Sequence, residues 1–71
     1  MATYILCNPD GGIHSARRGD ELPPELELKL DIPEGGFYVD LTGQGNFDTL
    51  DLGEILTNYT ADAKTKKLTK R

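Results

Sequence analysis

Phe37-Tyr38-Val39-Asp40-Leu41-Thr42 is the stretch around which the rest of the chain is organised. Its aromatic and β-branched side chains suit the pleated, half-buried surface of a β-strand. Gly35-Gly36 precedes this stretch and Gly43-Gln44-Gly45 follows it, and glycines of this kind mark the ends of regular elements. The sequence therefore predicts a strand over residues 37–42, against which the other segments pack.

A β-hairpin is predicted at the start of the chain. Residues 3–7 are apolar and rich in strand formers, residues 8–12 read Asn-Pro-Asp-Gly-Gly, and residues 13–17 form a second, weaker strand pattern. Proline presets φ and glycine accepts positive φ, so residues 8–12 favour a turn. Because an isolated hairpin is marginal in water, we expect it to pair with a third strand.

Residues 25–32 alternate between apolar and charged side chains. The apolar members, which would share one face of a strand, are Leu26, Leu28, Leu30 and Ile32. This period of two predicts a strand with one solvated face, paired antiparallel with residues 37–42. Leucine, glutamate and lysine are also helix formers, and Pro24 suits a first helical position, so one or two helical turns are the alternative.

One short helix is predicted at about residues 48–57. Asp48 or Thr49 can serve as its N-cap, because a side-chain oxygen there accepts from the first backbone N–H groups. Its apolar side chains follow helical spacing, at Leu52, Ile55, Leu56 and Tyr59. After it, residues 59–61 and 67–69 predict a terminal hairpin. The alternative is a fraying end, in which residues 64–71 form a flexible basic tail.

Length and composition limit what the chain can be. It has 71 residues, which predicts a single domain over 1–71. A core below roughly 70–80 residues rarely supplies more than about 3–5 kcal/mol, so we expect a homo-oligomer or a protein partner. A single cysteine and a single histidine exclude an internal disulfide and leave too few ligands for a Cys/His zinc site. We expect no cofactor and no metal.

The charge distribution argues against nucleic acid as a partner. The first 57 residues carry eleven acids and three basic residues, whereas residues 58–71 carry five basic residues and one acid. An acidic body repels a phosphate backbone. The chain also has no apolar run of membrane-spanning length and no secretory leader pattern, so we expect residence in a cytoplasm and no membrane partner.

The sequence offers no catalytic constellation, and we predict that the protein is not an enzyme. Cys7 and His14 flank the first turn, but no motif that would orient a nucleophile surrounds either residue, and a cysteine among apolar neighbours is more often a core residue. Asp48, Asp51 and Glu54 could line one edge of the helix. Their spacing is not that of a calcium loop, and the simpler interpretation is a solvated face. We retain these three carboxylates as candidate partner contacts.

Two segments resemble short, mostly uncharacterised phage and prophage proteins. Tyr4-Ile5-Leu6-Cys7-Asn8-Pro9-Asp10-Gly11 is similar to their opening strand and turn. A spaced pattern in residues 53–68 resembles their terminal hairpin, with its members at Tyr59, Asp62, Thr65 and Leu68. The similar parts cover under half of the chain. Such proteins are often encoded near tail or lysis genes, and others act against host defences. The resemblance implies a phage source and a binding role, and it carries no catalytic residue across.

These patterns together predict a mostly β, α+β domain. We expect an antiparallel sheet of three to five strands with one short helix near 48–57. The residues predicted to form the core are Tyr4, Ile5, Leu6, Ile13, Leu26, Leu28, Leu30, Ile32, Phe37, Val39, Leu41, Leu52, Ile55, Leu56 and Tyr59. The expected function is a non-catalytic, phage-encoded interaction module, a minor virion or assembly component in the host cytoplasm or on the virion. The alternative is an inhibitor of a host defence system that acts through its acidic surface.

Overall fold

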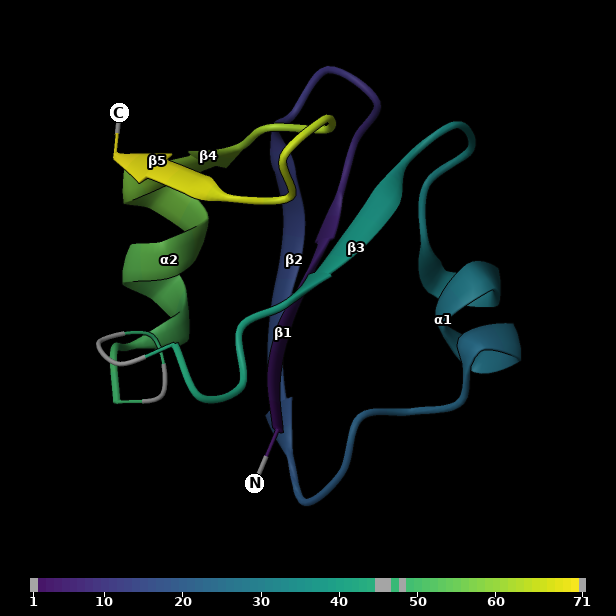
Figure 1. The fold of residues 1–71 in the computed structure, drawn as a ribbon, viewed down its shortest axis with the longest axis horizontal. Coiled ribbons are helices and arrows are strands. Elements are labelled where there is room, and N and C mark those ends of the chain that lie inside the picture. Colours follow the sequence, from purple (N-terminus) through teal and green to yellow (C-terminus); the bar gives the residue numbers. More distant parts are fainter. Residues whose placement is uncertain (1, 45–46, 48, 71) are drawn as a thin grey trace.

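The computed structural model describes residues 2–44, 47 and 49–70, and these form a small α+β fold as predicted (Figure 1). The elements in chain order are β1 (Ala2–Cys7), β2 (Ile13–Gly19), α1 (Glu25–Asp31), β3 (Phe37–Asp40), α2 (Leu52–Asn58), β4 (Tyr59–Ala61) and β5 (Leu68–Lys70). The strands form two antiparallel sheets, of order β2-β1-β3 and β4-β5. The predicted hairpins at both ends of the chain are confirmed, as β1–β2 and β4–β5.

The central element is β1 and not the 37–42 stretch. β1 pairs with β2 on one side and β3 on the other, and all six of its residues are buried because both faces of this strand are covered by packed side chains. β3 pairs with β1 in a register that sets Ile5 opposite Val39, and it is an edge strand. The backbone N–H of Leu41 still donates to the carbonyl of Thr3, at 2.8 Å, one residue beyond the end of β3.

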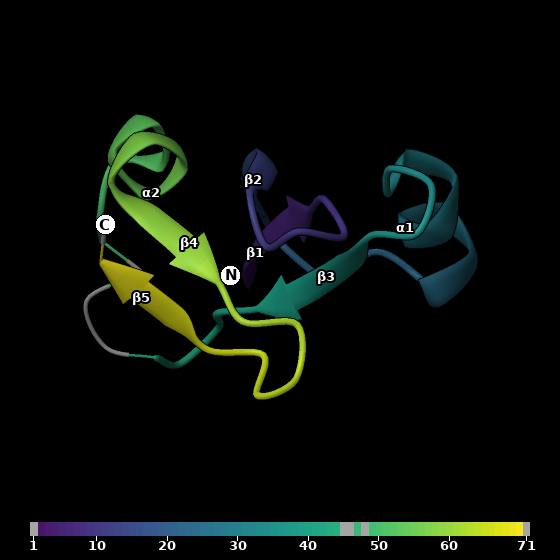
Figure 2. The ribbon, with the colours of Figure 1, turned by 90° about the horizontal axis from the view of Figure 1, so that it is seen from above.

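The three-stranded sheet lies between two layers (Figure 2). One face carries Tyr4 and Leu6, which pack against Leu28 of α1. The opposite face packs against α2 and β4, and its buried residues are Ile5, Cys7, Ile13, Val39, Leu41, Ile55 and Ala61. The alternation of side chains along β1 and β3 therefore supplies two small cores, one on each face.

The predicted strand at 25–32 is wrong, since residues 25–31 form α1. The Pro24 carbonyl accepts from the N–H groups of Glu27 and Leu28, at 3.0 and 3.1 Å, which starts the helix. Alternate residues of a helix lie about 200° apart around its axis, so they cannot share a face. Leu28 is 2% exposed, whereas Leu26 is 77% and Leu30 is 85% exposed. The predicted pairing of 25–32 with 37–42 and the predicted burial of Leu26 and Leu30 are therefore wrong.

The second helix begins later than expected. α2 spans Leu52–Asn58, and its N-cap residue is Asp51 and not Thr49. The other predicted cap, Asp48, lies outside the described residues. Ile55 is fully buried against the sheet, but Leu56 is 37% exposed, so its predicted place in the core is wrong. The remaining predicted core residues are buried or half-buried. The buried Ala2 and Ala61, which are too small to stand out in a hydrophobic pattern, were missed.

Candidate functional site

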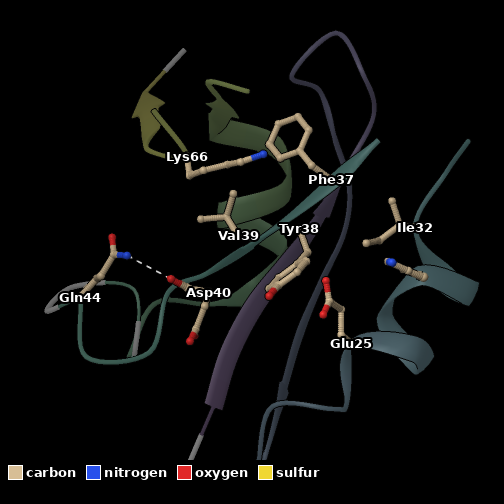
Figure 3. A pocket seen from close by; sticks show the side chains of 9 residues that line it. Glu25, Ile32, Phe37, Tyr38, Val39, Asp40, Gln44 and Lys66 are labelled. Carbon is tan, nitrogen blue, oxygen red and sulfur yellow. Dashed lines mark hydrogen bonds between the residues drawn. The ribbon is translucent and has the colours of Figure 1, made fainter. Parts of the chain in front are cut away.

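A hollow of about 540 Å³ lies beside β3, between the two layers that cover the sheet (Figure 3). Glu25 and Lys29 of α1 line one side together with Ile32, the residue that follows this helix, and all four residues of β3 line the floor. Gln44 and Lys66 line the other side. The hollow is therefore built from neighbouring segments within residues 25–44 and from Lys66, which is distant in the sequence and joins them only in the fold.

The lining of this hollow carries both signs of charge. Glu25 and Asp40 contribute two carboxylates, and Lys29 and Lys66 contribute two ammonium groups. The Lys66 ammonium lies 4.2 Å from the centre of the Phe37 ring, within the range of a cation–π contact. A surface with balanced charge does not select a strongly charged small ligand, but it suits a protein surface that carries both signs.

The backbone of Lys66 is held in place by the turn between β4 and β5. Its φ is +59°, in the left-handed region, and its N–H donates to the Asp62 carbonyl at 2.8 Å. The Asp62 carboxylate accepts from the N–H of Lys64 at 2.8 Å. These bonds fix the backbone of the turn from which the Lys66 side chain extends to Phe37.

The outer edge of β3 opens onto this hollow. Because Leu41 donates to Thr3 and antiparallel pairs alternate, Val39 and Phe37 also direct their backbone groups towards β1. The N–H and C=O groups of Tyr38 and Asp40 therefore point away from the sheet. Consistent with this, the Asp40 carbonyl accepts from the side-chain Nε2 of Gln44 at 3.0 Å. Among the described residues, no strand pairs with this edge.

The candidate nucleophile and base are not brought together as a reactive pair. Cys7 is fully buried, whereas His14, on β2, is exposed. Burial raises the pKa of the Cys7 thiol to about 11, and nearby Lys66 lowers it by less. The thiol is therefore protonated at neutral pH, and a protonated thiol is a weak nucleophile.

The predicted acidic contacts are only partly described. Asp51 and Glu54 are both exposed, and Asp51 starts α2 through its carbonyl, which accepts from Glu54 and Ile55 at 3.0 and 3.1 Å. Asp48, the third of these carboxylates, lies outside the described residues. Within the described ranges, no three His, Cys, Asp or Glu side chains are grouped to hold a metal ion. A partner contact at Asp51 and Glu54 stays a prediction.

The exposed leucines of α1 form a second surface, which the sequence interpretation missed. Leu26 and Leu30 are four residues apart, so they are neighbours on one side of the helix, roughly opposite the buried Leu28. Pro24 and the helix-forming composition were the signals that could have revealed this surface. We call Leu26 and Leu30 the α1 leucine pair.

Comparison with known proteins found no matching protein family, curated sequence or solved structure. Among the described residues, no helix is both long and apolar enough to cross a membrane.

Proposed function

We propose that the chain is a non-catalytic protein–protein interaction module, and that the α1 leucine pair contacts its partner. The supporting observation is the exposure of Leu26 and Leu30, at 77% and 85%. Two large apolar side chains side by side on a helix lose their contact with water when a partner covers them, which favours binding. Neither leucine packs in the core of the domain, so the apolar surface of both side chains is free to be buried against a partner.

The resemblance to phage and prophage proteins supports a more specific role. We infer a minor virion or assembly component, present in the host cytoplasm or on the particle, with a phage structural protein as the partner. The small core is consistent with this role, because a domain of this size often gains stability from an assembly.

The test uses particles of the phage that encodes the chain, carrying Leu26→Ser and Leu30→Ser together. We expect the wild-type chain in purified particles and at least about a tenfold loss of the double variant, since each buried leucine contributes about 1.5–3 kcal/mol. Leu56→Ser is the matched control, because Leu56 is 37% exposed on the other layer. Absence of the wild-type chain from particles, or equal incorporation of all three proteins, would argue against this role.

A second candidate function is inhibition of a host defence enzyme through an acidic surface. The segment over residues 20–34 carries six exposed carboxylates and one lysine, and the acids are Asp20, Glu21, Glu25, Glu27, Asp31 and Glu34. Such a surface suits a basic nucleic-acid channel. Its complex with a host nuclease should weaken sharply over about a tenfold rise in ionic strength. A salt-insensitive complex, or no binding to any host nuclease, would count against it.

A further inference from the structure

We propose that the outer edge of β3 binds an extended peptide segment of another protein. The segment adds one strand antiparallel to β3, and it carries a basic side chain three positions before an acidic one. This surface is separate from the α1 leucine pair, and the inference goes beyond the proposed function. An unpaired strand edge is a template for an incoming strand, and β3 forms the floor of the hollow in which that strand would lie (Figure 3).

The backbone groups that the segment would use belong to alternate residues of β3. Tyr38 and Asp40 direct their N–H and C=O groups away from β1. An antiparallel strand exchanges two N–H···O=C bonds with Tyr38 and accepts a third from the Asp40 N–H. The Asp40 carbonyl already accepts from the Nε2 of Gln44 at 3.0 Å, so these three groups are the ones that a peptide would satisfy first.

The walls of the hollow favour a single extended strand over a folded partner. Residues of α1 stand on one side of the edge, and Gln44 and Lys66 stand on the other. The hollow has a volume of about 540 Å³, which is enough for a few residues of extended chain. A second copy of this chain carries the same walls beside its own β3, whereas an extended segment has none and can reach the floor.

The charged side chains of the hollow are separated along β3. At the first residue of this strand, the Lys66 ammonium lies 4.2 Å from the centre of the Phe37 ring. At the last residue, Asp40 supplies a carboxylate, and Figure 3 shows Glu25 towards the same end. Lys29 lies one helical turn after Glu25, nearer the Phe37 end, because α1 leads directly into the start of β3. One end of the hollow is therefore basic and the other acidic.

The two faces of the sheet determine which side chains of the segment meet these charges. Tyr38 packs on the face that α1 covers, and alternation places Asp40 on the same face. Phe37 packs on the opposite face. In an antiparallel pair, the residue opposite Asp40 comes three positions before the residue opposite Phe37, and each shares the face of the residue it opposes.

Charge complementarity then specifies the segment. The residue opposite Asp40 lies beside two carboxylates and is expected to be lysine or arginine. Because Oδ1 of Asp40 already accepts from the Thr42 N–H at 2.9 Å, Glu25 is the main partner of this basic side chain. The residue opposite Phe37 lies beside Lys66 and is expected to be aspartate or glutamate. The order of the two charges distinguishes this segment from a generic extended peptide.

The first experiment titrates the capped hexapeptide Thr-Arg-Val-Thr-Glu-Thr into isotope-labelled protein and follows the backbone amides by NMR. The Tyr38 and Asp40 amides should shift and become protected from hydrogen exchange, whereas the Val39 amide, which already points towards β1, should change little. A matched peptide with glutamine at both charged positions should bind at least about fivefold more weakly. A peptide with a methyl group on the backbone nitrogen of its second threonine should not bind, because that N–H donates to the Tyr38 carbonyl.

Protein variants test the order of the charges. Glu25→Lys and Lys66→Glu should each weaken binding of the charged peptide by at least about fivefold, because each replaces an attraction with a repulsion. Glu27→Lys and Lys67→Glu are the matched controls, since both residues are exposed and neither lines the hollow, and these variants should bind like wild type. Glu25→Lys should bind Thr-Glu-Val-Thr-Glu-Thr better than the original peptide. Circular dichroism checks the fold of every variant, and Glu25→Gln takes the place of Glu25→Lys if the latter does not fold.

Several results would overturn the proposal. These are absence of binding by the charged peptide, equal binding of the charged and neutral peptides, unchanged binding of the methylated peptide, and equal losses in the variants and their controls. Protection of the Tyr38 amide that rises with protein concentration in the absence of peptide would also overturn it, because a second copy would then occupy the edge.

Discussion

Arg18 is the side chain whose loss should cost the fold most among the charged residues of β2. Its Nε donates to the hydroxyl of Thr3 at 3.1 Å, and its Nη2 donates to the carbonyls of Phe47 and Leu50, at 2.9 and 2.8 Å. One guanidinium therefore connects β2, β1 and the segment that leads into α2. A planar group with several donors can satisfy three acceptors in this way, whereas a lysine ammonium on a flexible stem cannot place its donors in the same geometry.

The magnitude follows from these contacts. A hydrogen bond to a charged group contributes about 1.5–3 kcal/mol, and the three bonds of Arg18 share one side chain, so their losses do not add in full. We expect Arg18→Ala to lower the free energy of unfolding by about 3 kcal/mol. Thr3 is only 1% exposed, so its hydroxyl would also lose its partner without gaining water. A core of this size supplies about 3–5 kcal/mol, so the variant should be close to unfolding at room temperature.

Urea denaturation measures the change, and Arg17→Ala is the matched control. Arg17 is the neighbouring residue of the same strand, and it pairs with Asp31 at 2.8 Å, with side chains 42% and 51% exposed. An exposed pair of this kind contributes less than about 1 kcal/mol. With a slope of about 1 kcal/mol per molar urea for a small domain, the midpoint should fall by about 3 M for Arg18→Ala and by under about 1 M for Arg17→Ala. Equal shifts for the two variants would refute the reasoning.

Three further predictions concern buried positions. Burial raises the pKa of the Cys7 thiol from 9.0 in the unfolded chain to about 11 in the fold, so between these pH values only the unfolded state ionises. The free energy of unfolding should therefore fall by about 2 kcal/mol from pH 9 to 11, and denaturation of Cys7→Ala across this range should lack that decrease. Gly36→Ala should lower the free energy of unfolding by about 1–3 kcal/mol and the melting temperature with it, since a Cβ there would collide with the Cys7 carbonyl. Gly19→Ala is the control, because Gly19 has open space around it, and this variant should melt within a few degrees of wild type. In urea denaturation, Leu28→Ala should lower the free energy of unfolding by about 2–4 kcal/mol, because Leu28 is buried, and Leu26→Ala should lower it by under about 0.5 kcal/mol, because Leu26 is exposed. Equal losses for the two variants would contradict the placement of α1.

The α1 segment shows why an unbroken sequence pattern can mislead. The alternation in residues 25–32 satisfies the template of a half-buried strand, yet the same residues are good helix formers. The fold uses only Leu28 as a core residue, against Tyr4 and Leu6, and leaves Leu26 and Leu30 in solvent. Alternation predicts a strand only if a neighbouring strand supplies backbone partners. The outer edge of β3 had room for such a strand among the described residues, but the segment turns into a helix at Pro24, whose carbonyl accepts from Glu27 and Leu28.

The hollow beside β3 could not be predicted from the sequence either. Its lining comes from residues 25–32, 37–40 and 44, which follow one another in the chain, and from Lys66, which no local spacing connects to them. The carboxylates that did follow a local spacing, Asp51 and Glu54, lie at the start of α2 and do not line the hollow. A surface that forms where a helix, a strand and a distant turn meet leaves no periodic signal in the chain, because its members belong to different elements.

Local chemistry by itself determined the two hairpins, the strand at β3 and the approximate place of α2. Turn residues, β-branched side chains and helical spacing act within a few positions of one another, so they can be seen in the sequence. The tertiary structure alone decided the central place of β1, the burial of Leu28 in preference to Leu26 and Leu30, the open edge of β3 and the partner of Arg18. These depend on which distant segments compete for the same backbone groups and the same apolar surface, and that competition is settled only when the whole chain packs.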